Sequence, residues 1–267
     1  MAVIWGLDLR EMQWGKFKSS YMWNDEYHLR RTKFIVYQCA MIFCVVSESL
    51  GTAALSDYVD QQAFVEKRDT NASVHNNDYI GAASYNIFVG IYVATIFGSG
   101  FFFDLFWPER HETPAVKLAW RLCSVLACVF ALASALTLTV VTATHAAHVS
   151  GVDAARARQL LDAYGGSPLR YRSNGRAIAS VVFLWPGFLS TVASTVLLWM
   201  SLAHNDRLGP KSTHARAAEK EYAVPTTDTS SASAPAVDGP VEHAAAANGV
   251  AHPQNAHVNG AAPYEGV

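Results

Sequence analysis

Four long apolar segments constrain the fold of this 267-residue chain more than any other feature. They cover residues 34–55, 79–103, 118–144 and 177–202. Their only charged residues are Glu48 and Arg121. A helix needs about 20 mostly apolar residues to cross the hydrocarbon core of a bilayer, which is about 30 Å thick. Each segment meets that length, so we expect an all-α integral membrane protein built on a four-transmembrane-helix bundle.

The composition narrows the classes of protein and partner. Only 16% of the residues are charged, whereas soluble domains have about a quarter. A net charge of −2 argues against a nucleic-acid binder that acts through overall basicity. All four cysteines lie inside the apolar segments, so no disulfide framework is expected in the loops. The expected partners are the lipid bilayer and either other membrane proteins or a second copy of the chain, with no nucleic acid.

The positions of the basic residues predict the orientation, because Lys and Arg concentrate on the cytosolic side of membrane spans. Six lie before residue 34, three at 110–121 and four at 207–220, which makes thirteen on the side of the N-terminus. The other side has seven. We therefore expect both termini in the cytosol, in a plasma membrane or an endomembrane. The one glycosylation sequon, at Asn71, then falls on the opposite side and is a glycosylation candidate.

The segments between and outside the spans differ in character. Residues 1–33 combine aromatic and basic side chains, which is typical either of an interfacial anchor on anionic lipids or of a segment that folds against the bundle. Residues 56–78 carry five acidic side chains and are expected to form a solvated loop. In the loop at 145–176, Asp153 can begin a short helix and Gly165-Gly166 can end it. Residues 203–267 have few large apolar residues, which predicts a disordered cytosolic tail.

Small residues recur every four positions within three of the apolar segments. This spacing lets helix backbones approach closely, and van der Waals packing then favours association in lipid. The residues expected at helix contacts are Gly90, Ala94, Gly98, Ala127, Ala131, Ala135 and Gly187.

One acidic residue lies deep in a predicted span. Counted from the ends of their segments, Glu48, Asn86 and Thr137 all lie roughly 10–12 Å below the membrane surface opposite the termini. A charge at such depth is costly, so Glu48 should face the bundle interior with Asn86 or Thr137 as its hydrogen-bond partner. The backbone carbonyl that Pro186 leaves free is another acceptor for a protonated carboxyl group. The glutamate then either ties helices together, forms a proton- or cation-linked site, or simply snorkels outward.

The sequence contains no motif that indicates catalysis or a cofactor. Nucleophile elbow, phosphate-binding loop, dinucleotide-binding glycine pattern and HExxH motif are all missing from it. His145 and His148 share a helix face, but a metal site normally needs three or four ligands, so no metal site is expected. We therefore expect a non-enzymatic tetraspanning protein that organises membrane or partner proteins, with its cytosolic N-terminal segment and tail as contact surfaces. The alternative is a small transporter or channel subunit that uses Glu48 and Asn86 as an intramembrane polar site.

The expected layout, four spans with cytosolic termini and two loops on the other side, resembles the MARVEL and claudin-like families of tetraspanning proteins in topology. The claudin-type Gly-Leu-Trp with two cysteines in the first outer loop is missing. The Cys-Cys-Gly of tetraspanins is missing too. The sequence therefore assigns the chain to no family.

Overall fold

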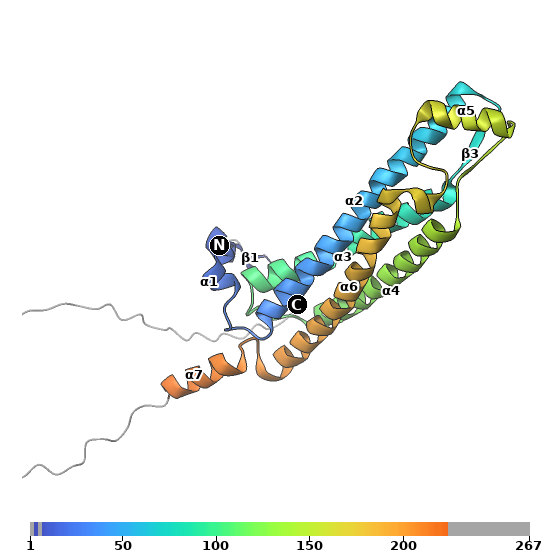
Figure 1. Cartoon of the computed structure of the whole chain (residues 1–267). Coiled ribbons are helices and arrows are strands. Elements are labelled where there is room, and N and C mark those ends of the chain that lie inside the picture. Colours follow the sequence, from blue (N-terminus) through green and yellow to red (C-terminus); the bar gives the residue numbers. More distant parts are fainter. Residues whose placement is uncertain (1–2, 5–6, 224–267) are drawn as a thin grey trace, which may run out of the picture. The chain divides into compact units, whose positions relative to one another are not determined.

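Four long helices make up most of the structure, a computed structural model that describes residues 3–4 and 7–223 (Figure 1). They are α2 (Arg30–Arg68), α3 (Asn77–Phe106), α4 (Pro114–Thr144) and α6 (Gly175–Leu208). Each is long and apolar enough to span a membrane, which confirms the four apolar helices that the sequence predicts. The helices form a ring in which α2 and α4 each pack against both α3 and α6.

Burial along α2 follows one repeat over the whole helix. Apart from the additional buried residue Phe34, its buried positions alternate in steps of three and four: Arg30, Lys33, Tyr37, Ala40, Cys44, Ser47, Gly51, Ala54, Tyr58, Gln61 and Val65. The same steps run through α6 from Ala177 to Ser201. A mean spacing of 3.5 residues keeps one face of each helix turned toward its neighbours, as in left-handed helical bundles.

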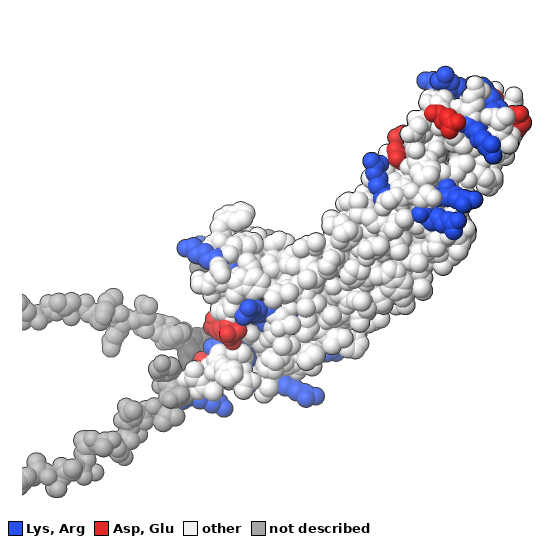
Figure 2. All heavy atoms as spheres, viewed as in Figure 1, with Lys and Arg blue, Asp and Glu red and all other residues white. Residues whose placement is uncertain are grey.

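The outward faces of the four helices are apolar. Large side chains such as Ile42, Leu122 and Val182 are each more than half exposed. On the face shown in Figure 2, the charged side chains gather toward the two ends of the bundle and leave the middle of its length without charge. An apolar belt between charged ends is the surface expected of a bundle that is solvated by lipid.

Small residues lie where the helices approach closely. Gly187 on α6 packs against Cys44 of α2, and a Cβ atom on this glycine would lie 2.9 Å from Cys44 Sγ. Gly98 faces Met41 in the same way, at 3.2 Å from its sulfur. Gly90 is buried against α2 as well. The three alanines of α4 that the sequence predicts at helix contacts are fully buried: Ala127, Ala131 and Ala135. Ala94 is only half-buried.

The loop expected at 56–78 is largely helical, because α2 continues to Arg68. The acidic residues of this stretch are tolerated because they avoid the buried positions at Tyr58, Gln61 and Val65. Beyond α2, strand β3 (Ser73–His75) pairs antiparallel with β4 (His148–Ser150).

Helix α5 (Ala154–Tyr164) confirms the helix predicted in the second loop. Asp153 caps it by accepting a hydrogen bond from the Arg156 backbone N–H, and Gly165 ends it with a φ of 65°. A short 3-10 helix, η3 (Tyr171–Ser173), then leads into α6. We call residues 56–76 and 145–176 together the cap.

The opposite end of the bundle is covered by the N-terminal segment. It contains strands β1 (Val3–Ile4) and β2 (Leu7–Asp8), 3-10 helices η1 (Leu9–Glu11) and η2 (Trp14–Phe17), and helix α1 (Ser19–Met22). The segment folds against the end of α3, where the Trp107 indole N–H donates to the Asp8 carbonyl (2.8 Å). Residues 7–33 of this segment therefore pack against the bundle, and the interpretation as a lipid anchor stays a prediction.

The predicted boundary of the tail is wrong. Helix α6 runs to Leu208, six residues past the expected end of the span, and α7 (Thr213–Ala223) follows it. The connection between them is held by the N-terminal segment, because the Ser212 backbone N–H donates to the Glu26 carbonyl (2.7 Å). The rest of the predicted tail, residues 224–267, lies outside the described residues.

Candidate functional site

A polar cluster lies inside the bundle and takes one side chain from each long helix. Asn86 of α3 is its centre: its amide donates to Ser47 Oγ of α2 (3.1 Å), and its carbonyl oxygen accepts from Ser134 Oγ of α4 (3.1 Å). Ser47 and Ser180 of α6 each donate to the other's backbone carbonyl at 2.8 Å. All four side chains are at most 1% exposed. The cluster therefore links all four helices through hydrogen bonds.

Close approach at this level depends on a glycine. A Cβ atom on Gly51 would lie 3.2 Å from Ser180 Oγ and 3.5 Å from Asn86 Nδ2. The missing side chain makes room for the hydroxyl and the amide between α2, α3 and α6.

Glu48 is adjacent to this cluster in the sequence but does not join it. Its carboxylate lies against Gly90 of α3, so close that a Cβ atom on this glycine would be 1.9 Å from Oε2. Within the part of the chain that the structure describes, Oε2 is buried and has no hydrogen-bond partner. The predicted hydrogen bond from Glu48 to Asn86 or Thr137 is therefore wrong. Asn86 is occupied by two serines, and Thr137 lies on the exposed face of α4.

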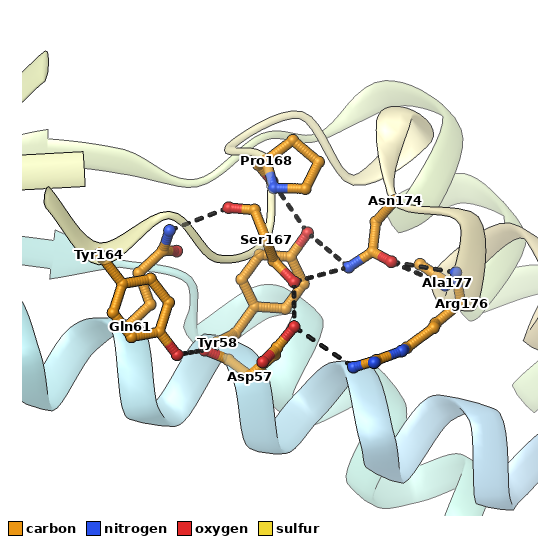
Figure 3. Close-up of polar contacts among 9 residues, drawn as sticks. All are labelled: Asp57, Tyr58, Gln61, Tyr164, Ser167, Pro168, Asn174, Arg176 and Ala177. Atoms are coloured by element: carbon orange, nitrogen blue, oxygen red, sulfur yellow. Dashed lines mark hydrogen bonds and ion pairs between the residues drawn. The ribbon is translucent and has the colours of Figure 1, made fainter. Parts of the chain in front are cut away.

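A second polar network lies within the cap and fastens its second segment, residues 145–176, to the extension of α2 (Figure 3). The Tyr58 hydroxyl donates to the Pro168 carbonyl (3.0 Å), and the Gln61 amide donates to the Ser167 carbonyl (2.9 Å). Asn174 donates to both Ser167 Oγ (3.1 Å) and the Tyr58 hydroxyl (3.3 Å). Asp57 accepts from Ser167 Oγ (2.7 Å). These bonds hold the loop before α6 on the helical extension of α2.

Three tyrosine rings pack together beneath this network. Tyr58, Tyr79 and Tyr171 have ring centroids 4.9–5.3 Å apart. The Tyr171 hydroxyl donates to Asp78 Oδ1 (2.6 Å). Burial raises the pKa of Tyr171 above its ordinary value, and the Asp78 carboxylate raises it further. The hydroxyl therefore stays protonated and acts as a hydrogen-bond donor.

The two histidines considered as metal ligands have other contacts. His145 Nδ1 lies 2.7 Å from Asp78 Oδ2, and the His148 ring stacks on His75 with centroids 4.7 Å apart. Among the described residues, no three His, Cys, Asp or Glu side chains gather as a metal site.

At the N-terminal end of the bundle, four charged residues form an ion-pair chain. Lys33 donates to Asp104 (2.7 Å) and to Ser201 Oγ (2.9 Å), and Arg110 pairs with both Asp104 (3.0 Å) and Glu112 (2.6 Å). Burial lowers the pKa of Arg110, but the two carboxylates outweigh it and raise the pKa above its ordinary value. This ion-pair chain, with the hydrogen bond to Ser201, joins α2, α3 and α6 at the N-terminal end of the bundle.

Residue Arg30 lies beside this ion-pair chain in an aromatic setting. It is only 2% exposed, and its guanidinium carbon is 4.5 Å from the ring centre of Tyr21 and 5.0 Å from that of Tyr27. The buried guanidinium is thus stabilised by stacking on aromatic faces, where a cation is more often stabilised by hydrogen bonds to acidic side chains.

Reasoning from the sequence placed Asn86 in an intramembrane polar site but missed its serine partners, and it missed the cap network. A signal for them exists, because Ser47, Tyr58 and Gln61 all fall on the three-and-four repeat of α2. Ser180 falls on the same repeat in α6. Comparison of the chain with protein-family models, with curated proteins and with solved structures finds no match.

Proposed function

We propose that this chain is a non-enzymatic, four-span membrane protein that serves as a platform for partner proteins, with the cap as its recognition surface. One observation carries the proposal: α2 is a single helix of 39 residues that forms part of both the bundle and the cap. At 1.5 Å per residue it is about 58 Å long, nearly twice the thickness of a hydrocarbon core. A helix that continues so far past the bundle holds the cap at a fixed height and angle.

The use of polar groups supports a structural role for the bundle. Inside a membrane, hydrogen bonds between helices stabilise their association. Asn86, Ser47, Ser134 and Ser180 bind one another, and the same principle fastens the cap through Tyr58 and Asn174. The interior polar residues thus contribute to holding helices, which is what a platform requires.

The proposed orientation places both termini in the cytosol and the cap on the other side. The excess of basic residues at the N-terminal end supports it. Asn71 supplies the test, since its side chain is exposed in the turn after α2. Translation of the chain into microsomes should yield a glycosylated form that Asn71→Gln abolishes, while a tag after Val267 stays open to added protease. An unmodified chain whose cap is cleaved by that protease would overturn the orientation.

Recognition through the cap is tested by a surface variant. Arg158 is exposed on α5, and Arg31 is exposed at the other end of the bundle, so Arg158→Glu and Arg31→Glu form a matched pair. After purification from native membranes and quantitative mass spectrometry, Arg158→Glu should lose partner proteins that the wild-type chain and Arg31→Glu both retain. The same partner set with all three chains would overturn the assignment of the cap as the recognition surface.

A second candidate function, a small transporter or channel subunit, is favoured by one observation. The buried carboxylate oxygen of Glu48 is without a hydrogen-bond partner among the described residues, and ionisable groups in spans often mark ion pathways. Flux of protons or monovalent cations into proteoliposomes discriminates between the candidates. Flux that Glu48→Gln abolishes and Thr137→Val preserves would replace the platform proposal, whereas the platform requires no flux.

A further inference from the structure

An apolar groove runs along α3 beside the N-terminal segment. Its volume is about 670 Å³. One wall comes from the N-terminal segment and the other from α3, with lining residues that include Met12, Trp14, Phe17, Ala94, Gly98 and Phe102. Trp14 is 89% exposed. From Ala94 to Phe106 the groove follows thirteen residues of helix, about 18 Å from the first to the last. One leaflet of a hydrocarbon core is about 15 Å deep, so the groove matches the length of an acyl chain.

A second apolar groove lies between α3 and α4 at the same end of the bundle. Its volume is about 520 Å³. Its apolar lining includes Ile96, Phe103, Val116, Ala119, Trp120 and Cys123. Phe103 borders the first groove as well. Two apolar grooves therefore descend along α3 with the Phe103 ring between them.

A polar pocket adjoins both grooves at the N-terminal end of the bundle. Its volume is about 580 Å³, and it shares Trp107 with the first groove and Arg110 with the second. It is lined by two basic residues, Lys16 and Arg110, and by two acidic residues, Glu11 and Glu109. Lys16 is paired with Glu11, and Arg110 is paired with Asp104 and Glu112. A lone anion would gain little from such a lining, whereas a group that carries both charges is complementary to it.

The individual contacts in the polar pocket suit a phosphate and an ammonium group. Lys16 Nζ donates to the Phe106 carbonyl (2.5 Å) and to Glu11 (3.3 Å), which leaves the third of its hydrogens for a phosphate. Glu109 accepts from the Tyr27 hydroxyl (3.4 Å) and keeps further lone pairs for an ammonium group. Trp107 also lines the pocket, and aromatic faces attract alkylammonium groups.

We propose that these three cavities bind one glycerophospholipid whose headgroup carries a phosphate and an ammonium, with its two acyl chains on either side of Phe103. The proposal rests on the membrane insertion proposed above. It goes beyond bulk solvation by lipid, because the N-terminal segment forms a wall of the site and is pinned to α3 through Trp107 and Lys16. The bound lipid would thus be part of the folded N-terminal end.

The test uses the full-length chain, purified in detergent and titrated in native mass spectrometry with three dioleoyl lipids. Phosphatidylethanolamine has both headgroup charges, phosphatidylglycerol has only the phosphate, and diacylglycerol has neither. We expect the affinity for the first bound molecule of phosphatidylethanolamine to be at least about threefold higher than the affinity for phosphatidylglycerol or for diacylglycerol. Phosphatidylcholine, which also carries both charges, should compete with it.

Two pairs of variants test the two parts of the site. Glu109→Gln removes the negative charge but retains an acceptor for Tyr27, and it should abolish the preference for phosphatidylethanolamine over phosphatidylglycerol. Glu26→Gln, an exposed acid outside the pocket, should leave it unchanged. Ala119→Phe fills the second groove and should weaken binding of phosphatidylethanolamine about threefold or more. Leu122→Phe, exposed on α4 and outside that groove, should not.

Several results would overturn the proposal. Equal binding of all three lipids, unaffected by Glu109→Gln, would mean bulk solvation only. Tighter binding of phosphatidylglycerol would mean that the basic residues act alone, and a dimer mass in place of a lipid adduct would mean that a second copy covers the grooves. Failure of membrane insertion is a separate outcome, since the chain would then be extracted from cell membranes by alkaline carbonate.

Discussion

Glu48 lies directly against Gly90, and its Oε2 atom occupies the space where any other residue at position 90 would place its Cβ, 1.9 Å away. The carboxylate of α2 is therefore accommodated by the bare backbone of α3. Positions 48 and 90 are therefore coupled by steric contact and not by a hydrogen bond.

The first prediction concerns this pair. Gly90→Ala should destabilise the bundle by about 1–3 kcal/mol, because the methyl group forces Glu48 from its place. Thermal unfolding of the detergent-solubilised chain measures the effect. Gly81→Ala on the same helix is the control, since nothing lies within 4 Å of a Cβ atom there. Adding Glu48→Ala to Gly90→Ala should recover part of the loss, and strictly additive effects of the two changes would contradict direct contact.

The second prediction compares two residues that the sequence places at equal depth. Asn86→Leu should cost about 1–3 kcal/mol, because it removes hydrogen bonds to Ser47 and Ser134 that are worth about 0.6 kcal/mol on average and up to about 1.7 kcal/mol each, and because leucine is bulkier. Thr137→Val, on the exposed face of α4, should change stability by less than about 0.5 kcal/mol. Equal losses for the two variants would contradict the cluster.

The third prediction concerns the attachment of the cap. Tyr58→Phe leaves the Pro168 carbonyl and the Asn174 amide without the hydroxyl that they share. An unmade hydrogen bond of this kind costs about 1–3 kcal/mol, so amide hydrogen exchange in residues 165–176 should accelerate about tenfold or more. Tyr85→Phe, on the half-buried face of α3, serves as the control. Unchanged exchange in the loop would show that packing alone holds the cap.

The fourth prediction concerns pH at the N-terminal end. The His28 and His204 rings stack with centroids 3.6 Å apart. Burial lowers the pKa of His28, and His204, Lys33 and Arg216 lower it further. Because the folded-state pKa lies below the ordinary value of about 6.5, the unfolded chain binds more protons near that pH. Stability should therefore fall as the pH drops from 7.5 to 5.5.

The variant His28→Gln isolates this effect. It removes one titrating ring from the stack, so its midpoint of thermal unfolding should fall less between pH 7.5 and 5.5 than that of the wild-type chain. His75→Gln, on strand β3 at the other end of the structure, provides the comparison for loss of any histidine. A decline as steep in His28→Gln as in the wild-type chain would assign the pH dependence to other groups.

The four long helices could be predicted because hydropathy and length together leave few alternatives for such segments. The continuation of α2 to Arg68 could not be recognised from hydropathy, since acidic residues lower the hydropathy of the sequence beyond Leu55. The repeat at Ala54, Tyr58, Gln61 and Val65 was the signal for it. The spacing of buried positions still predicts a helix in a charged segment, because the charged side chains lie on the solvent-facing sides of that helix.

A difference between depth and rotation explains why the predicted hydrogen-bond partners of Glu48 are wrong. Counting residues from a span's end fixes depth, but each step also turns the helix by 100°, so residues at equal depth can face in different directions. Ser47 falls on the buried repeat of α2, and Glu48 lies one step beyond it. Likewise Ser134 and Leu138 lie on the buried face of α4, and Thr137 does not. Depth and rotation together would have selected the four residues that meet.

The unbroken repeat of α2 also has a mechanical consequence. The Lys33 ammonium is tied to Asp104 at one end of this helix, and Val65 is buried in the cap near the other. Since α2 is one continuous helix, it acts as a lever arm about 52 Å long from Lys33 to its far end. A tilt of about 5° at the ion pairs displaces the far end by about 5 Å, roughly the rise of one helical turn. A movement at the ion pairs would thus reach the cap as a change of position.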